Sequence, residues 1–204
     1  MSKKTLSENL WKRRKDSDLF YHSAKNEGYR ARSAYKLIEI NKKFNIFKKK
    51  KVTIDLGAAP GSWSQVLVKN NLNKIIAIDI KDIELIEGVT FIKKDINELI
   101  ENKKYFDKYS IDLVLSDMAP KSTGHKFTDQ TKAAILAEKA LTFATKYLIK
   151  NGDFVCKLLH GKGEKDMQER AKKNFNIAKF FKPKSSRRDS KEIYLICLGF
   201  NNLQ

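Results

Sequence analysis

Residues 53–65 read Thr-Ile-Asp-Leu-Gly-Ala-Ala-Pro-Gly-Ser-Trp-Ser-Gln, an apolar run that ends in a carboxylate and breaks into a turn with two glycines and a proline. This pattern predicts a buried strand with Asp55 near its tip, a tight loop bracketed by Gly57 and Gly61, and the start of a helix. Glycines let the backbone approach a bound nucleotide closely, and the helix start offers unpaired N–H groups. A pyrophosphate prefers neutral or cationic surroundings, so a carboxylate here favours a cationic ligand such as S-adenosylmethionine. The same strand, turn and helix can also serve packing alone.

Strand-like and helix-like segments alternate from Val52 onward. Near-continuous apolar strands that alternate with helices indicate a parallel sheet covered on both faces. The sequence predicts strands at 52–56, 74–80, 89–93, 111–116, 152–158, 175–181 and 192–199. It predicts helices at 31–44, 62–70, 96–104, 129–149 and 164–173.

The end of the chain departs from this alternation. Residues 182–191 leave no room for a crossover helix between the last two strand-like runs, so the last strand is expected to be antiparallel to its neighbour. Seven strands with an antiparallel last one describe the methyltransferase variant of the Rossmann-like α/β fold. We expect one such domain over residues 29–204, preceded by a basic, partly helical arm over residues 1–28.

The chain is strongly basic, with a formal net charge of +18 over 204 residues. Such a charge points to a polyanionic partner, with nucleic acid first, although a lysine-rich composition can also arise by drift. Only seven of the 42 basic residues are Arg, whose planar fork suits phosphate, so arginine positions are more informative. The predicted phosphate-binding residues are Arg13, Arg14, Arg30, Arg32, Lys182, Lys184, Arg187 and Arg188.

Other features indicate a cytosolic protein without membrane association. Cys156 and Cys197 lie in apolar runs with no metal-like spacing, so they are expected to be reduced core residues, and no metal site is expected. No apolar stretch reaches membrane-spanning length, and the N-terminus has no secretory pattern. We expect a cytoplasmic monomer.

Four carboxylates follow four successive predicted strands: Asp55, Asp79, Asp95 and Asp117. Ligands of open α/β sheets bind beyond the carboxyl ends of the strands. Asp79 lies where an acidic residue would accept hydrogen bonds from ribose hydroxyls, and Asp95 could meet an adenine amino group. Either one alone could instead be a helix N-cap, but together they favour a nucleoside-bearing ligand.

Three further charged residues stand out. Lys157 lies inside an otherwise apolar strand, where burial of an ammonium is costly without a partner, unless it reaches water from the strand end. Glu192 opens the last strand and Lys36 lies on the helix after Arg30 and Arg32. Taken alone, each of these two would more often be a solvated surface charge.

The chain resembles the FtsJ/RrmJ family of RNA 2′-O-ribose methyltransferases, and within it the bacterial enzymes of large-subunit ribosomal RNA. The segments that carry the resemblance are 28–37, 55–65, 116–120, 152–157 and 185–194. The family's Lys-Asp-Lys-Glu tetrad falls on Lys36, Asp117, Lys157 and Glu192. Its cofactor contacts fall on Gly61, Trp63, Asp79, Asp95 and Asp117, to which the loop adds Asp55 and Gly57. The chain departs from the bacterial pattern at Ser62, where a second glycine is usual, and at Ala34-Tyr35, which replaces an aromatic pair.

The resemblance implies methyl transfer from S-adenosylmethionine to a ribose 2′-hydroxyl, with Lys157 as the proposed base. A free lysine is protonated at neutral pH, so the cations nearby, Lys36 and the sulfonium, are expected to favour the neutral amine. The expected partner is ribosomal RNA, within the large ribosomal subunit. Alternatives are a methyltransferase of tRNA riboses or mRNA caps, a ribosome-assembly factor without chemistry, and a dinucleotide dehydrogenase. Ser116-Asp117-Met118-Ala119-Pro120 favours the ribosomal branch over the tRNA branch, and Asp55 disfavours the dehydrogenase.

Overall fold

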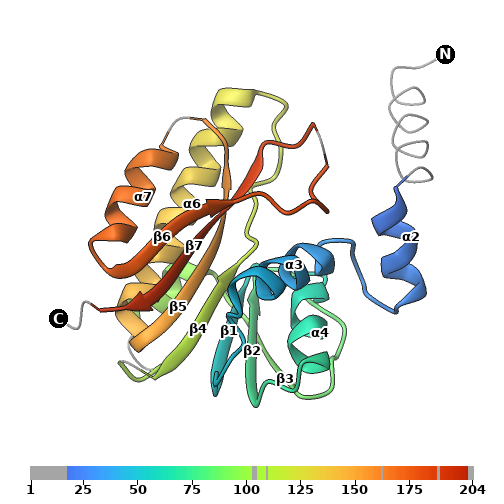
Figure 1. Cartoon of the computed structure of the whole chain (residues 1–204), viewed down its shortest axis with the longest axis horizontal. Helices are drawn as coiled ribbons and strands as arrows, with labels where there is room; N and C mark the ends of the chain where they lie inside the picture. The colour runs from blue at the N-terminus through green and yellow to red at the C-terminus, as the bar shows by residue number, and fades with distance from the viewer. Residues whose placement is uncertain (1–17, 103–104, 109, 162, 188, 202–204) are drawn as a thin grey trace.

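The computed structural model describes residues 18–102, 105–108, 110–161, 163–187 and 189–201 (Figure 1). Three of the predicted phosphate-binding residues, Arg13, Arg14 and Arg188, lie outside this part of the chain. The strands are β1 (Val52–Leu56), β2 (Lys74–Asp79), β3 (Val89–Lys93), β4 (Ile111–Ser116), β5 (Leu148–Leu159), β6 (Phe175–Phe181) and β7 (Glu192–Phe200). The helices are α2 (Leu19–Asn26), α3 (Ala34–Phe44), α4 (Ser62–Lys69), α5 (Ile96–Glu101), α6 (Lys126–Tyr147) and α7 (Glu164–Lys172).

The seven strands form one sheet in the order β3-β2-β1-β4-β5-β7-β6. Neighbours from β3 to β5 pair in parallel, whereas β7 is antiparallel to both β5 and β6. The predicted α/β fold with an antiparallel last strand is therefore confirmed. The strand order reverses between β1 and β4, which makes their carboxyl ends the place where this fold binds ligands.

Several predicted boundaries are wrong by a few residues, most clearly the one between α6 and β5. The helix predicted over 129–149 ends at Tyr147, and β5 begins at Leu148, four residues before the predicted strand. Leu148 pairs with Ile111, after which the register shifts, and Asn151 adopts a left-handed conformation with φ 63°. Pairing with β4 thus ends the helix before its local preference for helix is exhausted.

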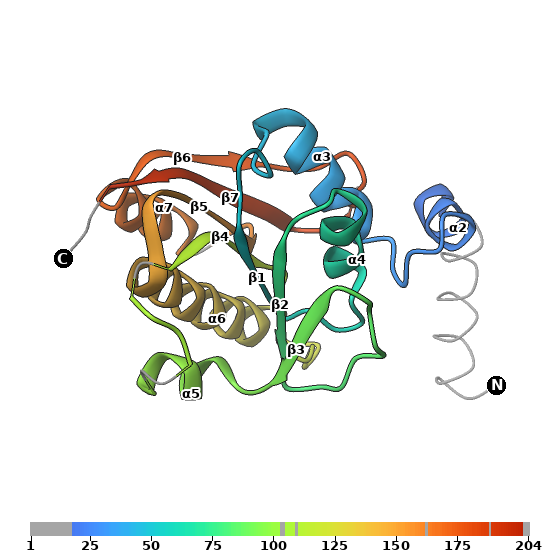
Figure 2. The same cartoon turned by 90° about the horizontal axis from the view of Figure 1, so that it is seen from below.

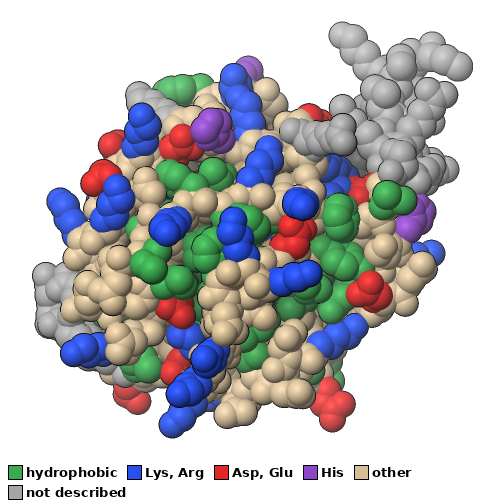
Figure 3. Space-filling model, in the orientation of Figure 1, with side chains coloured by type: hydrophobic (Ala, Val, Ile, Leu, Met, Phe, Trp, Pro, Cys, Tyr) green, Lys and Arg blue, Asp and Glu red, His purple; other side chains and the backbone are tan. Residues whose placement is uncertain are grey.

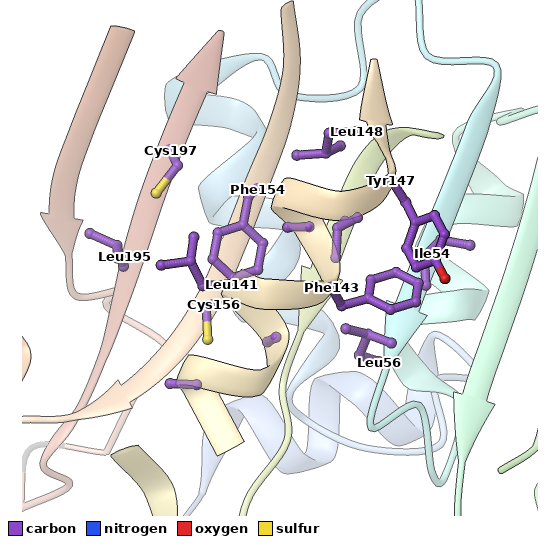
Figure 4. Packing of buried hydrophobic residues seen from close by; sticks show 14 of the residues in the cluster. Ile54, Leu56, Leu141, Phe143, Tyr147, Leu148, Phe154, Cys156, Leu195 and Cys197 are labelled. Atoms are coloured by element: carbon purple, nitrogen blue, oxygen red, sulfur yellow. The ribbon is translucent and has the colours of Figure 1, made fainter. Parts of the chain in front are cut away.

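Helices cover both faces of the sheet (Figure 2). On one face, α3 and α4 pack through Leu37, Ile40 and Leu67 onto the sheet, and this core includes Leu115 and Val155. On the other face, α5, α6 and α7 form the larger core, in which Phe143 and Tyr147 of α6 lie against Ile54 and Leu56 of β1 (Figure 4). Successive strand residues point to opposite faces, so Asp117 and Lys157 share the face of Leu115 and Val155.

Cys156 and Cys197 are buried free cysteines of the larger core. Burial raises the pKa of the Cys156 thiol to about 12. Within the described residues, no helix combines the length and the apolar character needed to cross a membrane.

Candidate active site

A cavity of about 550 Å³ lies at the carboxyl ends of β1, β2 and β4. Its volume is in the range of sites for small molecules and cofactors. Its polar lining includes the predicted Asp79, Asp95 and Asp117, and its walls include Leu56, Ile78, Ile96 and Leu136. Three carboxylates beside an apolar surface suit a ligand that combines hydroxyl or amino groups with a flat apolar ring.

The loop after β1 borders the cavity through Gly57 and Ala59. Gly57 has a φ of 74°, and a Cβ there would lie 2.6 Å from Cγ of Met118, so only glycine fits. Gly61 has a φ of 104° and precedes the first turn of α4. Asp79 accepts hydrogen bonds from the backbone N–H groups of Ala59 and Lys81, at 2.9 and 2.8 Å. The Asp79 carboxylate therefore ties this loop to the loop after β2.

Asp55 is completely buried beneath the loop and does not line the cavity. Its Oδ2 accepts a 2.7 Å hydrogen bond from Ser64, while its Oδ1 has no hydrogen-bond partner. The pKa of Asp55 is raised to about 7, mainly by burial and in smaller part by the nearby carboxylates Asp117 and Asp79, against the lowering effect of the Ser64 hydrogen bond. The buried oxygen without a partner is a place where positive charge would be favourable.

The raised pKa of Asp55 predicts a measurable effect of pH on stability. Between pH 4 and 7 the unfolded chain has released the Asp55 proton, whose ordinary pKa is 3.8, while the folded chain retains it. The contribution of Asp55 to stability is therefore complete below pH 4 and is lost as the pH rises to 7. Asp55→Asn removes this titration, so the free energy of unfolding of the variant relative to the unaltered protein should rise between pH 4 and 7, by up to about 4 kcal/mol, and stay level above pH 7.

Urea unfolding at a series of pH values measures this difference. The exposed Asp107 is the control, because Asp107→Asn should give no such rise. Parallel pH profiles for Asp55→Asn and the unaltered protein would contradict the assignment.

The four residues of the tetrad form two pairs. Lys157 Nζ lies 2.6 Å from the Asp117 carbonyl oxygen and 3.1 Å from Asp117 Oδ1. Lys36 Nζ lies 2.6 Å from Glu192 Oε2. The sequence left open which lysine pairs with which carboxylate. In the structure, Lys157 of β5 pairs with Asp117 after β4, and Lys36 of α3 pairs with Glu192 of β7. Lys157 does not reach water in the way a snorkelling lysine would, because its side chain is only 8% exposed.

Tyr194 is a member of this cluster that sequence reasoning missed. It lies directly opposite Lys157 in the β5–β7 ladder, and its hydroxyl donates a 2.8 Å hydrogen bond to Asp117 Oδ1. Burial, together with the charges of Asp117 and Glu192, raises the pKa of Tyr194 well above its usual value, so the hydroxyl stays protonated. The sequence pattern could have indicated Tyr194, because residues two apart in a strand share a face and Tyr194 follows Glu192 by two.

The remaining predicted cofactor residues have clear structural partners. Trp63 is buried, donates its indole N–H to the Ser33 carbonyl oxygen and lies 5.8 Å from the Tyr194 ring, and its side chain does not line the cavity. Asp95 lines the cavity and also caps α5 through Asn97, so both of its predicted roles are compatible. The hydroxyl of Ser62 bonds to that of Ser33 and does not cap α4.

The described members of the predicted phosphate-binding set lie in two groups. Lys182, Lys184 and Arg187 are exposed on the loop between β6 and β7. Arg32 is largely buried, where it contacts Asp18 and the carbonyl oxygen of Ser185. On the face shown in Figure 3, basic side chains are spread over the surface with acidic ones between them.

Arg30 lies apart from these two groups, and its guanidinium contacts three backbone carbonyl oxygens of the protein. Nη1 donates to the carbonyl oxygens of Pro60 and Glu84, at 3.0 and 2.9 Å, and Nη2 donates to that of Leu85 at 3.0 Å. These bonds join the loop after β1 to the loop after β2.

Comparison with known proteins agrees with this geometry. Residues 29–200 match the FtsJ-like methyltransferase family. This chain belongs to that family. A relative named ribosomal RNA large subunit methyltransferase E, from Wolbachia sp. subsp. Brugia malayi, is 45% identical over 195 residues, which cover 96% of this chain and 90% of the relative. A protein of the same name from Rickettsia bellii is 44% identical, with coverage of 97% and 91%. The crystal structure of a ribosomal RNA methyltransferase from Plasmodium falciparum superposes with a TM-score of 0.75 at 35% identity, covering 84% of this chain and 98% of that one.

An FtsJ-like methyltransferase requires a methyl donor, and the residues present fit S-adenosylmethionine. Asp117 in the cavity lining, with the buried carboxylate of Asp55 behind the loop, would favour a donor that carries positive charge. Asp79 and Asp95 are acceptors for hydroxyl and amino groups, and the apolar walls are suited to a purine ring. In this FtsJ-like methyltransferase, Asp117 connects the cavity and the tetrad. It lines the cavity, and it pairs with Lys157.

Proposed function

We propose that this protein transfers a methyl group from S-adenosylmethionine to the ribose 2′-oxygen of a uridine in 23S ribosomal RNA, during maturation of the large ribosomal subunit. The single observation that carries the proposal is the Lys157–Asp117 pair at the edge of the cavity. The Lys36–Glu192 pair beside it and the names of the relatives support the same reaction and substrate.

Bound S-adenosylmethionine would supply an electrophilic methyl group. A ribose hydroxyl is a poor nucleophile, so its proton must be removed as its oxygen attacks. A neutral Lys157 amine has two N–H groups and one lone pair. The Asp117 carbonyl oxygen and carboxylate accept from the N–H groups, which leaves the lone pair for the hydroxyl proton. Once protonated, Lys157 is stabilised by the Asp117 carboxylate, which Tyr194 holds in place.

The other pair has a supporting role in this proposal. Lys36 and Glu192 approach from α3 and β7; Lys36 is buried, and Glu192 is partly accessible. Glu192 orients Lys36, whose ammonium places a positive charge beside the Lys157–Asp117 pair. Asp79 and Asp95 hold the nucleoside part of the donor, and Asp117 contacts both the donor and the base.

The test is a methyl-transfer assay with radiolabelled S-adenosylmethionine and three acceptors: isolated large subunits from a strain lacking this gene, free 23S RNA and total tRNA. Labelled 2′-O-methyluridine in the ribosomal acceptors alone is the expected result. Labelled tRNA would favour the tRNA branch, and donor binding without transfer to any acceptor would favour an assembly factor.

RNA affinity is predicted to depend steeply on salt. The loop residues Lys182, Lys184 and Arg187 are exposed and cationic, so phosphates that bind there would release counterions. Replacement of all three by Ala should reduce the slope of log affinity against log salt concentration by about 2 to 3. Filter binding or anisotropy at a series of salt concentrations measures the slope. The matched control is Ala at Lys165, Lys172 and Lys173, which are exposed on and next to α7 across the sheet. Equal slopes for both variants would exclude the loop from the RNA-binding surface.

A further inference from the structure

We propose that Arg30 is a positioning residue of the cofactor site: its guanidinium holds the two loops beside the cavity at a fixed separation, and donor affinity depends on it. The inference rests on the proposed function, since it takes S-adenosylmethionine as the ligand of the cavity. It assigns to Arg30 a role different from the phosphate contact predicted from the sequence.

The contacts of Arg30 cross-link two loops that are distant in sequence. Nη1 bonds to Pro60 in the loop after β1 and to Glu84 in the loop after β2, and Nη2 bonds to Leu85. Ala59, next to Pro60, and Ile80 and Lys81, earlier in the loop that carries Glu84 and Leu85, line the cavity. Arg30 thus ties the loops together from outside, as Asp79 does from inside through Ala59 and Lys81.

The packing around the guanidinium is close. A Cβ on Gly61 would lie 2.8 Å from Arg30 Nη1 and 2.7 Å from Cδ1 of Ile86, so the absence of a side chain at Gly61 admits both. The backbone of Arg30 is anchored as well, because its N–H donates a 2.8 Å hydrogen bond to Oε1 of Gln65 on α4. The side chain is held at its base and at its tip.

These contacts leave little of the guanidinium for a phosphate. Both N–H groups of Nη1 are used, Nη2 donates to Leu85, and Oε2 of Glu84 lies 3.6 Å from Nη2. A phosphate that used Nη1 would have to displace the backbone carbonyl oxygens of Pro60 or Glu84. Arginine is required because one planar group must reach three acceptors, which the single ammonium of lysine cannot do in the same geometry.

The experiment measures S-adenosylmethionine binding by calorimetry to the full chain and its variants. Arg30→Lys keeps the positive charge and loses the planar guanidinium with its several N–H donors. It should raise the Kd for S-adenosylmethionine by about tenfold. Glu84→Ala is the matched control: it removes the exposed carboxylate and keeps both backbone acceptors, so its Kd should stay within about twofold of the unaltered value. In the methyl-transfer assay, Arg30→Lys should raise the KM for the donor by the same factor with kcat at saturating donor unchanged, a split that general loss of folded protein would not produce.

Three results would overturn the inference. Unchanged donor affinity in both Arg30→Lys and Arg30→Ala would remove the positioning role. Equal weakening by Arg30→Lys and Glu84→Ala would assign the effect to the ion pair. A selective loss of RNA affinity in Arg30→Ala, with a salt slope lower by about one charge, would restore the phosphate contact. If the unaltered protein bound no donor, the proposed function would fail and this inference with it.

Discussion

Lys157→Ala is expected to lower the rate of methyl transfer by about 10²- to 10⁴-fold, the usual contribution of a positioned general base. The variant loses the amine that is proposed to accept the hydroxyl proton, while Asp117 remains in place. Lys157 does not line the cavity, so the Kd for S-adenosylmethionine should change by less than about threefold. Single-turnover assays with isolated large subunits give the rate, and calorimetry gives the Kd.

Two further variants make this test specific. Lys157→Met keeps the bulk of the side chain opposite Tyr194 and should be as inactive as Lys157→Ala, which separates the lost base from a packing defect. Lys150→Ala is the matched control, because Lys150 lies on the same strand and is exposed. Turnover of Lys157→Ala close to that of the control would rule out Lys157 as the base.

Phe143→Ala is expected to lower the free energy of unfolding by about 3–5 kcal/mol. Phe143 is fully buried, and its ring centroid lies 4.9 Å from that of Tyr147 and 5.6 Å from that of Phe106 (Figure 4). Removal of the ring leaves a cavity between α6 and the centre of the sheet. Since a domain of this size is stable by only about 5–15 kcal/mol, the loss is a large fraction of the total.

Urea unfolding measures this loss, and the same helix provides the control. Phe127 also lies on α6 but is 67% exposed, so Phe127→Ala should cost less than about 1 kcal/mol. Similar losses for Phe143→Ala and Phe127→Ala would mean that α6 contributes little through its buried face.

The fold could be predicted in detail because hydrophobic pattern and turn residues are local properties. The predicted bounds of the strands at 52–56, 89–93 and 111–116 agree with β1, β3 and β4. The errors fall at the bounds of helices and of β5, as at Tyr147 and Leu148, where pairing between β4 and β5 decides the boundary. Local sequence cannot show this competition, because the pairing partner is more than thirty residues away.

The candidate site was predictable as a set of residues but not as an arrangement. Strand-end positions and the family motif indicated Asp79, Asp95, Asp117 and the tetrad, and these expectations stay predictions until donor or RNA binding is measured. Tyr194 and the internal partners of Arg30 were not foreseen. The hydrogen-bond acceptors of the Arg30 guanidinium are backbone carbonyl oxygens, which every residue has, so no sequence pattern identifies them.

The sequence by itself determined that residues 53–65 form a strand, a glycine-bracketed loop and a helix start, because a buried apolar run and positive-φ glycines have few other solutions. It also determined which charged residues are unusual, since a lysine within an apolar strand is costly wherever it lies. Only the tertiary structure decided that Lys157 pairs with Asp117 and Lys36 with Glu192, that Asp55 lies beneath the loop and not in the cavity, and that Arg30 faces inward. The physical reason is that the order of strands in the sheet and the packing of α3 against it fix distances of a few ångströms between groups up to 156 residues apart.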